Sequence, residues 1–130
     1  MINLEIGFKP KNYLPLPINY RGYLENILYL LSNDKDDILN QLFYSDFNCS
    51  KYEIDGSHII FKDKVNWIIS SQNYDIISNL VQGFFKKPTV KIGKSEFEVV
   101  FMKLSESAEL ESKNEFKLLN SFRMRDFEIA

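Results

Sequence analysis

The order in which two hydrophobic periods follow one another along the chain places the tightest limit on its fold. Over residues 2–8, apolar side chains occupy every second position, which is typical of a half-buried strand. After a proline-rich connection, apolar residues from Asn19 to Leu31 recur every three or four positions, with Asn19 placed to cap the helix. A strand followed by an amphipathic helix is therefore predicted. The predicted inner face of this helix comprises Tyr20, Tyr23, Leu24, Ile27, Leu28 and Leu31.

The next segment predicts a short helix and then a hairpin. The polar run SNDKDD breaks the first helix, and the residues after it form a second, shorter helix through Phe43. Strands over residues 47–54 and 57–62 are joined by Asp55-Gly56, a strong two-residue hairpin signal. These elements lead into a further strand, VNWIISS, over residues 65–71.

A second helix of full length follows that strand. Gln72 or Asn73 begins it, and it stops before Pro88, because the residue ahead of a proline disfavours helical dihedrals. An apolar stripe at helical spacing predicts which side chains face the core. That stripe contains Tyr74, Ile77, Leu80, Val81 and Phe84.

The last third of the chain predicts more strand. Residues 89–92 and 96–104 flank Gly93 and form either a hairpin or one long bulged strand. Residues 105–114 are a polar, acidic spacer, and residues 115–130 are a C-terminal strand segment. We therefore expect one α+β domain over residues 1–130, a ferredoxin-like β-α-β-β-α-β sandwich. Its antiparallel sheet would carry two main helices on one face.

Composition excludes several classes of function. Sixteen basic and eighteen acidic residues weaken any expectation of broad nucleic-acid binding but leave a local basic patch open. A single cysteine, Cys49, excludes an internal disulfide and a cysteine-based zinc cluster, so no metal or cofactor is expected. There is no signal-peptide pattern and no run of about 20 apolar residues. A cytoplasmic protein without membrane contact is therefore expected.

Three strings, in one order and with similar gaps, resemble segments of a known enzyme family. LPLPINYRGYLENILYLLS is similar to the first helix of the CRISPR-associated repeat-processing endoribonucleases, which are members of the RAMP superfamily. VNWIISSQNYDIISNLVQGFF resembles their strand and second helix, and VKIGKSEFEVVFMKL resembles the strand that follows. The match covers residues 1–104. It implies the first of the family's two tandem ferredoxin-like domains, without the second domain and its glycine-rich loop.

The resemblance also implies that a catalytic group is missing. The family cleaves CRISPR repeat RNA without metal, with a histidine, often joined by a tyrosine and a lysine, moving the protons. LFYSDFN, residues 42–48, stands at the histidine string, so Phe43 or Tyr44 takes the place of the imidazole. Phenylalanine cannot exchange a proton, and a tyrosine with a pKa of about 10 is a poor base at neutral pH. Tyr29 matches the family's first-helix tyrosine, and Lys51 loosely matches its lysine.

The remaining candidate residues each have a structural alternative. His58, the only histidine, reads more simply as a strand residue than as a transplanted base. The lysines of KKPTVKIGK can contact phosphates or can protect an edge strand from pairing. The arginines of FRMRDF can hold RNA, hold acidic groups of a partner, or lie in solvent. The candidate RNA- or partner-binding residues are Lys86, Lys87, Lys91, Lys94, Arg123 and Arg125.

Aromatic residues on strands are the alternative means of binding RNA. Phe61, Trp67 and Phe101 are the candidates for base stacking on a sheet, and we expect all three to pack under the helices instead.

Three hypotheses for function follow, from different classes. The first is a non-catalytic RAMP-like module in CRISPR immunity that binds a CRISPR effector or processing protein, as an anti-CRISPR mimic would. The near-neutral net charge of the chain favours a protein partner over RNA. The second is an accessory or truncated processing protein that binds CRISPR repeat RNA through the lysine-rich edge. The third, and weakest, is a metal-independent endoribonuclease using His58 or Tyr29. Pairing of an exposed edge into a homodimer is left open.

Overall fold

The computed structural model describes residues 1–31, 38–107 and 124–128, with the backbone alone described at 38–39 and 124–128. Its elements are β1 (Ile2–Pro10), β2 (Leu16–Pro17), α1 (Arg21–Leu31), the 3₁₀ helix η1 (Ile38–Gln41), β3 (Phe43–Tyr44), β4 (Asn48–Cys49), β5 (Tyr52–Asp55), β6 (His58–Phe61), β7 (Val65–Ser71), α2 (Tyr74–Lys86), β8 (Thr89–Ile92), β9 (Ser95–Glu106) and β10 (Met124–Glu128).

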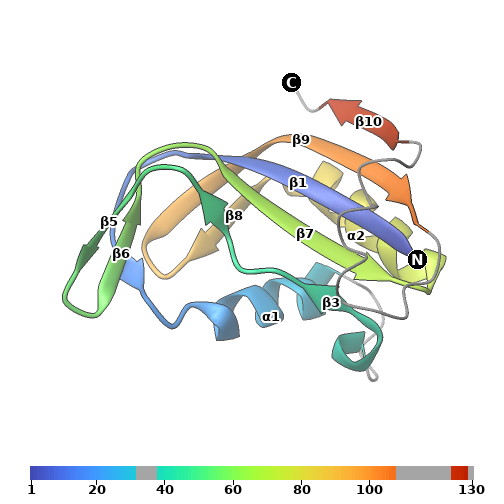
Figure 1. Cartoon of the computed structure of the whole chain (residues 1–130), viewed down its shortest axis with the longest axis horizontal. Coiled ribbons are helices and arrows are strands. Elements are labelled where there is room, and N and C mark those ends of the chain that lie inside the picture. Colours follow the sequence, from blue (N-terminus) through green and yellow to red (C-terminus); the bar gives the residue numbers. More distant parts are fainter. Residues whose placement is uncertain (32–37, 108–123, 129–130) are drawn as a thin grey trace.

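The main sheet has the strand order expected of a ferredoxin-like sandwich (Figure 1). β1 lies at its centre, antiparallel to β7 on one side and to β9 on the other. The short strands β3 and β4 pair with the outer edge of β7, while β8 and β10 pair with the outer edge of β9. The predicted α+β fold class, an antiparallel sheet with two main helices, is confirmed.

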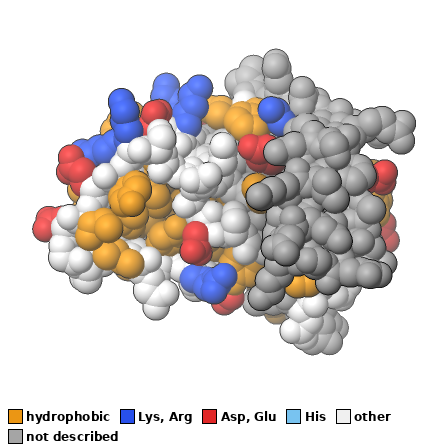
Figure 2. Space-filling view, viewed as in Figure 1, with side chains coloured by type: hydrophobic (Ala, Val, Ile, Leu, Met, Phe, Trp, Pro, Cys, Tyr) orange, Lys and Arg blue, Asp and Glu red, His pale blue; other side chains and the backbone are white. Residues whose placement is uncertain are grey.

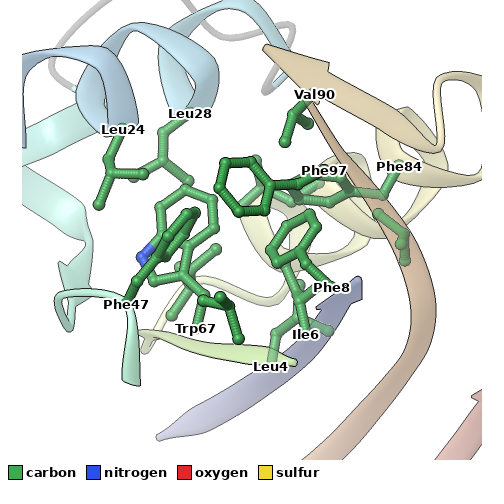
Figure 3. Close-up of a cluster of buried hydrophobic side chains, with 14 of the residues drawn as sticks. Leu4, Ile6, Phe8, Leu24, Leu28, Phe47, Trp67, Phe84, Val90 and Phe97 are labelled. Atoms are coloured by element: carbon green, nitrogen blue, oxygen red, sulfur yellow. The ribbon is translucent and has the colours of Figure 1, made fainter. Parts of the chain in front are cut away.

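The core lies between the sheet and the two helices (Figure 3). Alternation along β1 and β7 buries one face of each strand, as the period of two predicts. Aromatic rings from strands, loop and helix meet there, and Phe47 is the ring with the most aromatic partners. Its ring centroid lies 5.5–5.8 Å from those of its neighbours. These neighbours are Phe8, Tyr20, Phe61, Trp67 and Phe97.

The first residues of both helices and the side chains that they bury agree with the prediction, with three exceptions: the start of α1 and the exposure of two tyrosines. Asn73 caps α2, its side-chain oxygen accepting a hydrogen bond from the Asp75 amide at 3.0 Å. α1 begins one residue later than expected, because the carbonyl of buried Tyr20, not that of Asn19, accepts the first helical bonds. Tyr23 and Tyr74, predicted to face the core, are 43% and 59% exposed.

The segment between the helices differs from its prediction in three places. Within the described residues, the predicted second helix through Phe43 is the single turn η1, and Phe43 already belongs to β3. The predicted helix break at SNDKDD, residues 32–37, lies outside the described part of the chain. The predicted strand 47–54 is broken into β4 and β5. The Asp55-Gly56 hairpin of β5 and β6 is confirmed, but it pairs with β2 in a separate three-stranded sheet. In the main sheet, β3 and β4 pair with the outer edge of β7 instead of this hairpin.

A bulge in β9 moves Phe101 to the face of the sheet away from the helices. Phe8 pairs with Val99 but Gly7 pairs with Phe101, so the register slips by one residue between them. Beyond the bulge, Met102 takes the core-facing position. The prediction that Phe101 packs under the helices is therefore wrong, whereas Phe61 and Trp67 are buried in the core as expected.

The C-terminal predictions are only partly covered by the described residues. Ser105 and Glu106, predicted to open the acidic spacer, instead end β9. β10 falls within the predicted strand segment 115–130 and pairs antiparallel with β9. The rest of the spacer, residues 108–114, lies outside the described part of the chain.

Candidate functional site

At the position that resembles the family's histidine string, the structure places a tyrosine held by a carboxylate. The Tyr44 hydroxyl in β3 donates a short hydrogen bond to Glu25 Oε2 on α1. The Arg21 guanidinium lies over the Tyr44 ring, 5.2 Å from its centroid. Burial, followed by the hydrogen bond to Glu25 and the charge of that carboxylate, raises the pKa of Tyr44. The phenol thus keeps its proton at neutral pH and is less suited to accept one than an ordinary tyrosine.

The same segment is fixed in the core by its last aromatic residue. Phe47 is buried, and its backbone N–H donates to the Tyr20 hydroxyl at 3.1 Å. By contrast, Phe43 is 65% exposed and has no side-chain group that could move a proton. Residues 42–48 therefore combine a core anchor at one end with an exposed ring and a restrained phenol at the other.

Tyr20→Phe tests how the segment is anchored. Removing the hydroxyl leaves the buried Phe47 N–H without its acceptor, so we expect a loss of about 1 kcal/mol in the free energy of unfolding. Burial foremost raises the pKa of Tyr20, so the folded state holds the phenol proton more tightly than the unfolded state. The difference in proton affinity stabilises the folded state. This contribution to the free energy of unfolding is fully present below pH 10 and is lost as pH rises through the raised pKa of Tyr20. Urea titrations across this range should show a shallower alkaline decline in Tyr20→Phe; equal slopes would contradict the prediction.

The other candidate catalytic residues do not gather into one site. His58 begins β6 at the tip of the hairpin, where it pairs with Asp55 and is exposed. Lys51 precedes β5 at the base of the same hairpin, where its carbonyl accepts from the Lys62 amide. Four residues of strand separate the two along the hairpin, which is about 13 Å. Tyr29 lies on α1, one turn beyond Glu25 and 39% exposed.

A groove between the two helices and β8 brings three of the predicted lysines together. It has a volume of about 470 Å³, and none of the described residues that line it has an acidic side chain. Two helix faces and one strand edge form its walls. The lining residues are Tyr23, Asn26, Ile27, Leu30 and Leu31 from α1; Gln82, Gly83 and Lys86 from α2; Lys87 after it; and Thr89, Val90 and Lys91 from β8.

A close helix contact sets the floor of this groove. Gly83 lies against the end of α1, where an added Cβ would be 3.1 Å from Leu31 Cβ and 3.2 Å from the Leu31 carbonyl oxygen. Glycine at this position therefore lets the two helices approach closely. The α1 wall itself has helical spacing, since its five lining residues recur at three- and four-residue intervals.

The β8 wall offers unpaired backbone groups. Among the described strands β8 pairs only with β9, so its other edge is free. The Val99 amide donates to the Pro88 carbonyl at 2.7 Å, so Pro88 and Val99 are a hydrogen-bonded pair of the β8–β9 ladder. In an antiparallel pair, hydrogen-bonded positions alternate, so the N–H and C=O groups of Thr89 and Lys91 point away from β9. Both residues also line the groove.

The remaining predicted basic residues do not join the groove. Lys94 lies in the β8–β9 turn, where its carbonyl accepts from the Asn12 side chain at 3.0 Å. The Arg125 backbone lies in β10, and its side chain is not described. Arg123 lies outside the described residues. Lys86, Lys87 and Lys91 are thus the predicted residues that the structure brings together.

Sequence reasoning missed the α1 wall. Tyr23 was predicted in the core, and Leu30, which is 68% exposed, was not singled out. The available signal was a second stripe on α1, residues 23, 26, 27, 30 and 31, running beside the core stripe of Leu24 and Leu28. Two apolar stripes on one helix exceed what a single sheet can cover.

On the described part of the sheet face seen in Figure 2, most of the Lys and Arg side chains lie along the upper left edge, with acidic side chains beside them. Hydrophobic side chains gather at the end formed by β5 and β6, where Tyr52 and Ile54 are 54% and 59% exposed. Phe101 has its ring over Gly7 on this side of the sheet, with Lys103 Nζ 5.3 Å from the ring centroid.

Within the described residues, no three His, Cys, Asp or Glu side chains are grouped so as to hold a metal ion. No described helix has the length and apolar character needed to span a membrane. The Cys49 thiol is half-buried and donates to the Lys51 carbonyl at 3.0 Å.

Comparison with known proteins gives structural matches only. No family profile matches the sequence, and no curated protein matches it either. A RAMP protein that binds different RNA substrates superposes with a TM-score of 0.70 at 21% identity, over 100% of this chain and 63% of that one. A Cas6-related protein from Pyrococcus furiosus gives a TM-score of 0.72 at 20% identity, over 98% of this chain and 61% of that one. A CRISPR-associated Cas6 protein gives 0.65 at 18% identity, over 99% and 62%.

The fold is RAMP-like. Three matches with TM-scores of 0.65–0.72 agree on it, and they agree with the resemblance of the helix and strand strings over residues 1–104. The chain spans about three-fifths of the length of each of these proteins. At 18–21% identity the likeness establishes the fold, so activity and ligands have to be argued from the residues of this chain.

Proposed function

We propose that this chain is a CRISPR-related, RNA-binding RAMP module that holds repeat RNA without cleaving it. The observation that carries the proposal is the groove between α1, α2 and β8. Within the described part of the chain, three lysines and no acidic side chain line it, while the net charge of the full sequence is -2. Such a local excess of positive charge suits a phosphate backbone. The similarity to a RAMP protein that binds RNA supports the same ligand.

The residues at the histidine-like position support binding without cleavage. Activation of a ribose 2′-hydroxyl requires a group that accepts its proton near neutral pH. Phe43 offers no such group, whereas the Tyr44 hydroxyl donates a hydrogen bond to Glu25 and has a raised pKa. In this proposal the protein acts in the cytoplasm, and repeat RNA incubated with it at neutral pH stays intact on a denaturing gel.

The triple variant Lys86→Ala, Lys87→Ala, Lys91→Ala tests the groove. Each single-strand phosphate contact contributes about 0.7 to the slope of log affinity against log salt, so the variant should lower that slope by about 2. Fluorescence anisotropy of labelled repeat RNA at four salt concentrations measures it. The matched control replaces Lys9, Lys62 and Lys64, three exposed lysines away from the groove, with the same charge change. Equal slopes in the two triples, or no binding by the unaltered protein, would overturn the proposal.

A protein partner is the second candidate, and two observations favour it. Leu30 is 68% exposed in the groove, and β8 has a free edge to which an extended segment could add. In this form the chain would bind a CRISPR effector or processing protein, as an anti-CRISPR mimic, or a second copy of itself. Capture of a CRISPR protein that survives RNase and high salt would favour this candidate over RNA. Sedimentation of the isolated chain would report a homodimer.

A further inference from the structure

We propose that the groove is a single-nucleotide pocket, in which a base of single-stranded RNA stacks on Tyr23 while flanking phosphates contact Lys86, Lys87 and Lys91. This inference rests on the proposed function and names the form of RNA that the site takes. Tyr23 is 43% exposed, although it lies on a helix whose other apolar face is buried in the core. An aromatic ring beside lysines is the arrangement by which proteins hold unpaired bases and their backbone.

The polar groups of the walls suit the edge of a base. Asn26 on α1 and Gln82 on α2 are both exposed and line the groove from different helices. Each amide offers a donor and an acceptor, as does the outward-facing backbone of Thr89 and Lys91 on β8. A base lying against Tyr23 would therefore meet hydrogen-bonding groups on several sides, as bases held outside a helix do.

The size of the groove favours single-stranded RNA over duplex RNA as its ligand. A volume of about 470 Å³ lies within the range of about 300–1,000 Å³ typical of pockets that hold one small ligand. A base within a duplex is stacked and paired, and has to be extruded before it can enter such a pocket. Single-stranded RNA presents its bases without that cost. Discrimination against duplex therefore follows from the shape of the site.

The test uses a 12-nucleotide RNA with a central 2-aminopurine, alone or annealed to its complement, with the full chain. The single strand should bind at least tenfold more tightly than the duplex, with a change in 2-aminopurine fluorescence. Tyr23→Ala should weaken single-strand binding on the order of tenfold to a hundredfold, the loss expected for one stacked base. Tyr23→Phe, which keeps the ring, should bind nearly as the unaltered protein does.

The control is Tyr74→Ala, which removes a similarly exposed tyrosine from the first turn of α2, outside the groove. Thermal melting verifies that Tyr23→Ala remains folded. If the RNA binds with lysine-dependent salt sensitivity but Tyr23→Ala matches Tyr74→Ala, the pocket is wrong and the proposed function stands. Equal affinity for duplex also overturns the pocket. If no RNA binds, or an acidic peptide binds in its place, both proposals fail.

Discussion

Phe47→Ala should lower the free energy of unfolding by about 3–5 kcal/mol, the range for truncating a buried aromatic ring. Phe47 contacts five other aromatic rings and is 7% exposed, so its removal opens a cavity that rings held on four different strands and a loop cannot all close. Domains of this size are stable by only about 5–15 kcal/mol, so the variant would lose a large part of its total. Urea unfolding can be followed by the fluorescence of Trp67, the single tryptophan, which is 5.8 Å from Phe47 between ring centroids.

The control lies in the same segment, four residues earlier. Phe43 is the same residue type but is 65% exposed, so Phe43→Ala should change stability by no more than about 0.5 kcal/mol. Similar losses in the two variants would mean that the segment is not anchored through Phe47. A large loss for Phe47→Ala with little change for Phe43→Ala would confirm that folding does not require the ring at position 43, which is then free for contact with a ligand or partner.

Gly7→Ala should destabilise the protein by about 2 kcal/mol despite adding a single methyl group to a strand. A Cβ at this position would lie 2.0 Å from Phe101 Cε1, whereas ordinary contacts are 3.4–4 Å. Phe101 covers Gly7 because the bulge in β9 places the two residues opposite each other. The ring then has to leave the surface of β1, or the central strand pair has to separate locally.

A double-mutant cycle isolates that contact. In the Phe101→Ala background the space over Gly7 is open, so Gly7→Ala should be close to neutral or stabilising by up to about 1 kcal/mol, since alanine restricts the unfolded chain. Chemical unfolding of the four proteins gives the coupling free energy. An equal cost of Gly7→Ala in both backgrounds would show that the strain lies in the backbone instead of in the ring contact.

Hydrophobic periodicity in the sequence predicts those helices and strands whose buried face follows from their own residues alone. β1, β7 and α2 each have one apolar face that a single core covers, and all three were predicted close to their observed bounds. β3 was not predicted, and β4 was not separated from β5 in the predicted strand 47–54, because two residues carry no period. They are strands only because the edge of β7 is available to pair with them. The face of Phe101 depends on a register slip between β1 and β9, which alternation within one strand cannot reveal.

The candidate site divides in the same way. The sequence predicts the lysines of the groove and shows that residues 42–48 contain no histidine, because both depend on which residues are present. The partnership of Tyr44 with Glu25 joins residues 19 positions apart, and the α1 wall becomes part of a site only where α1 meets α2. Tyr23 fits either an inner or an outer stripe of the same helix. Which stripe it joins is decided by the packing of other elements.

The position of β1 between β7 and β9 has a consequence for how the protein folds during synthesis. The Met1 ammonium donates to the Ser107 carbonyl at 2.8 Å, and the two residues are 106 positions apart. β1 is made before the other described strands and therefore acquires its last neighbour only after both helices have left the ribosome. Pairing at such sequence separation is slow, on the order of milliseconds to seconds for comparable topologies. Until then the apolar face of Leu4, Ile6 and Phe8 has one open strand edge beside it, which makes the nascent chain a natural client for chaperones that bind exposed strands.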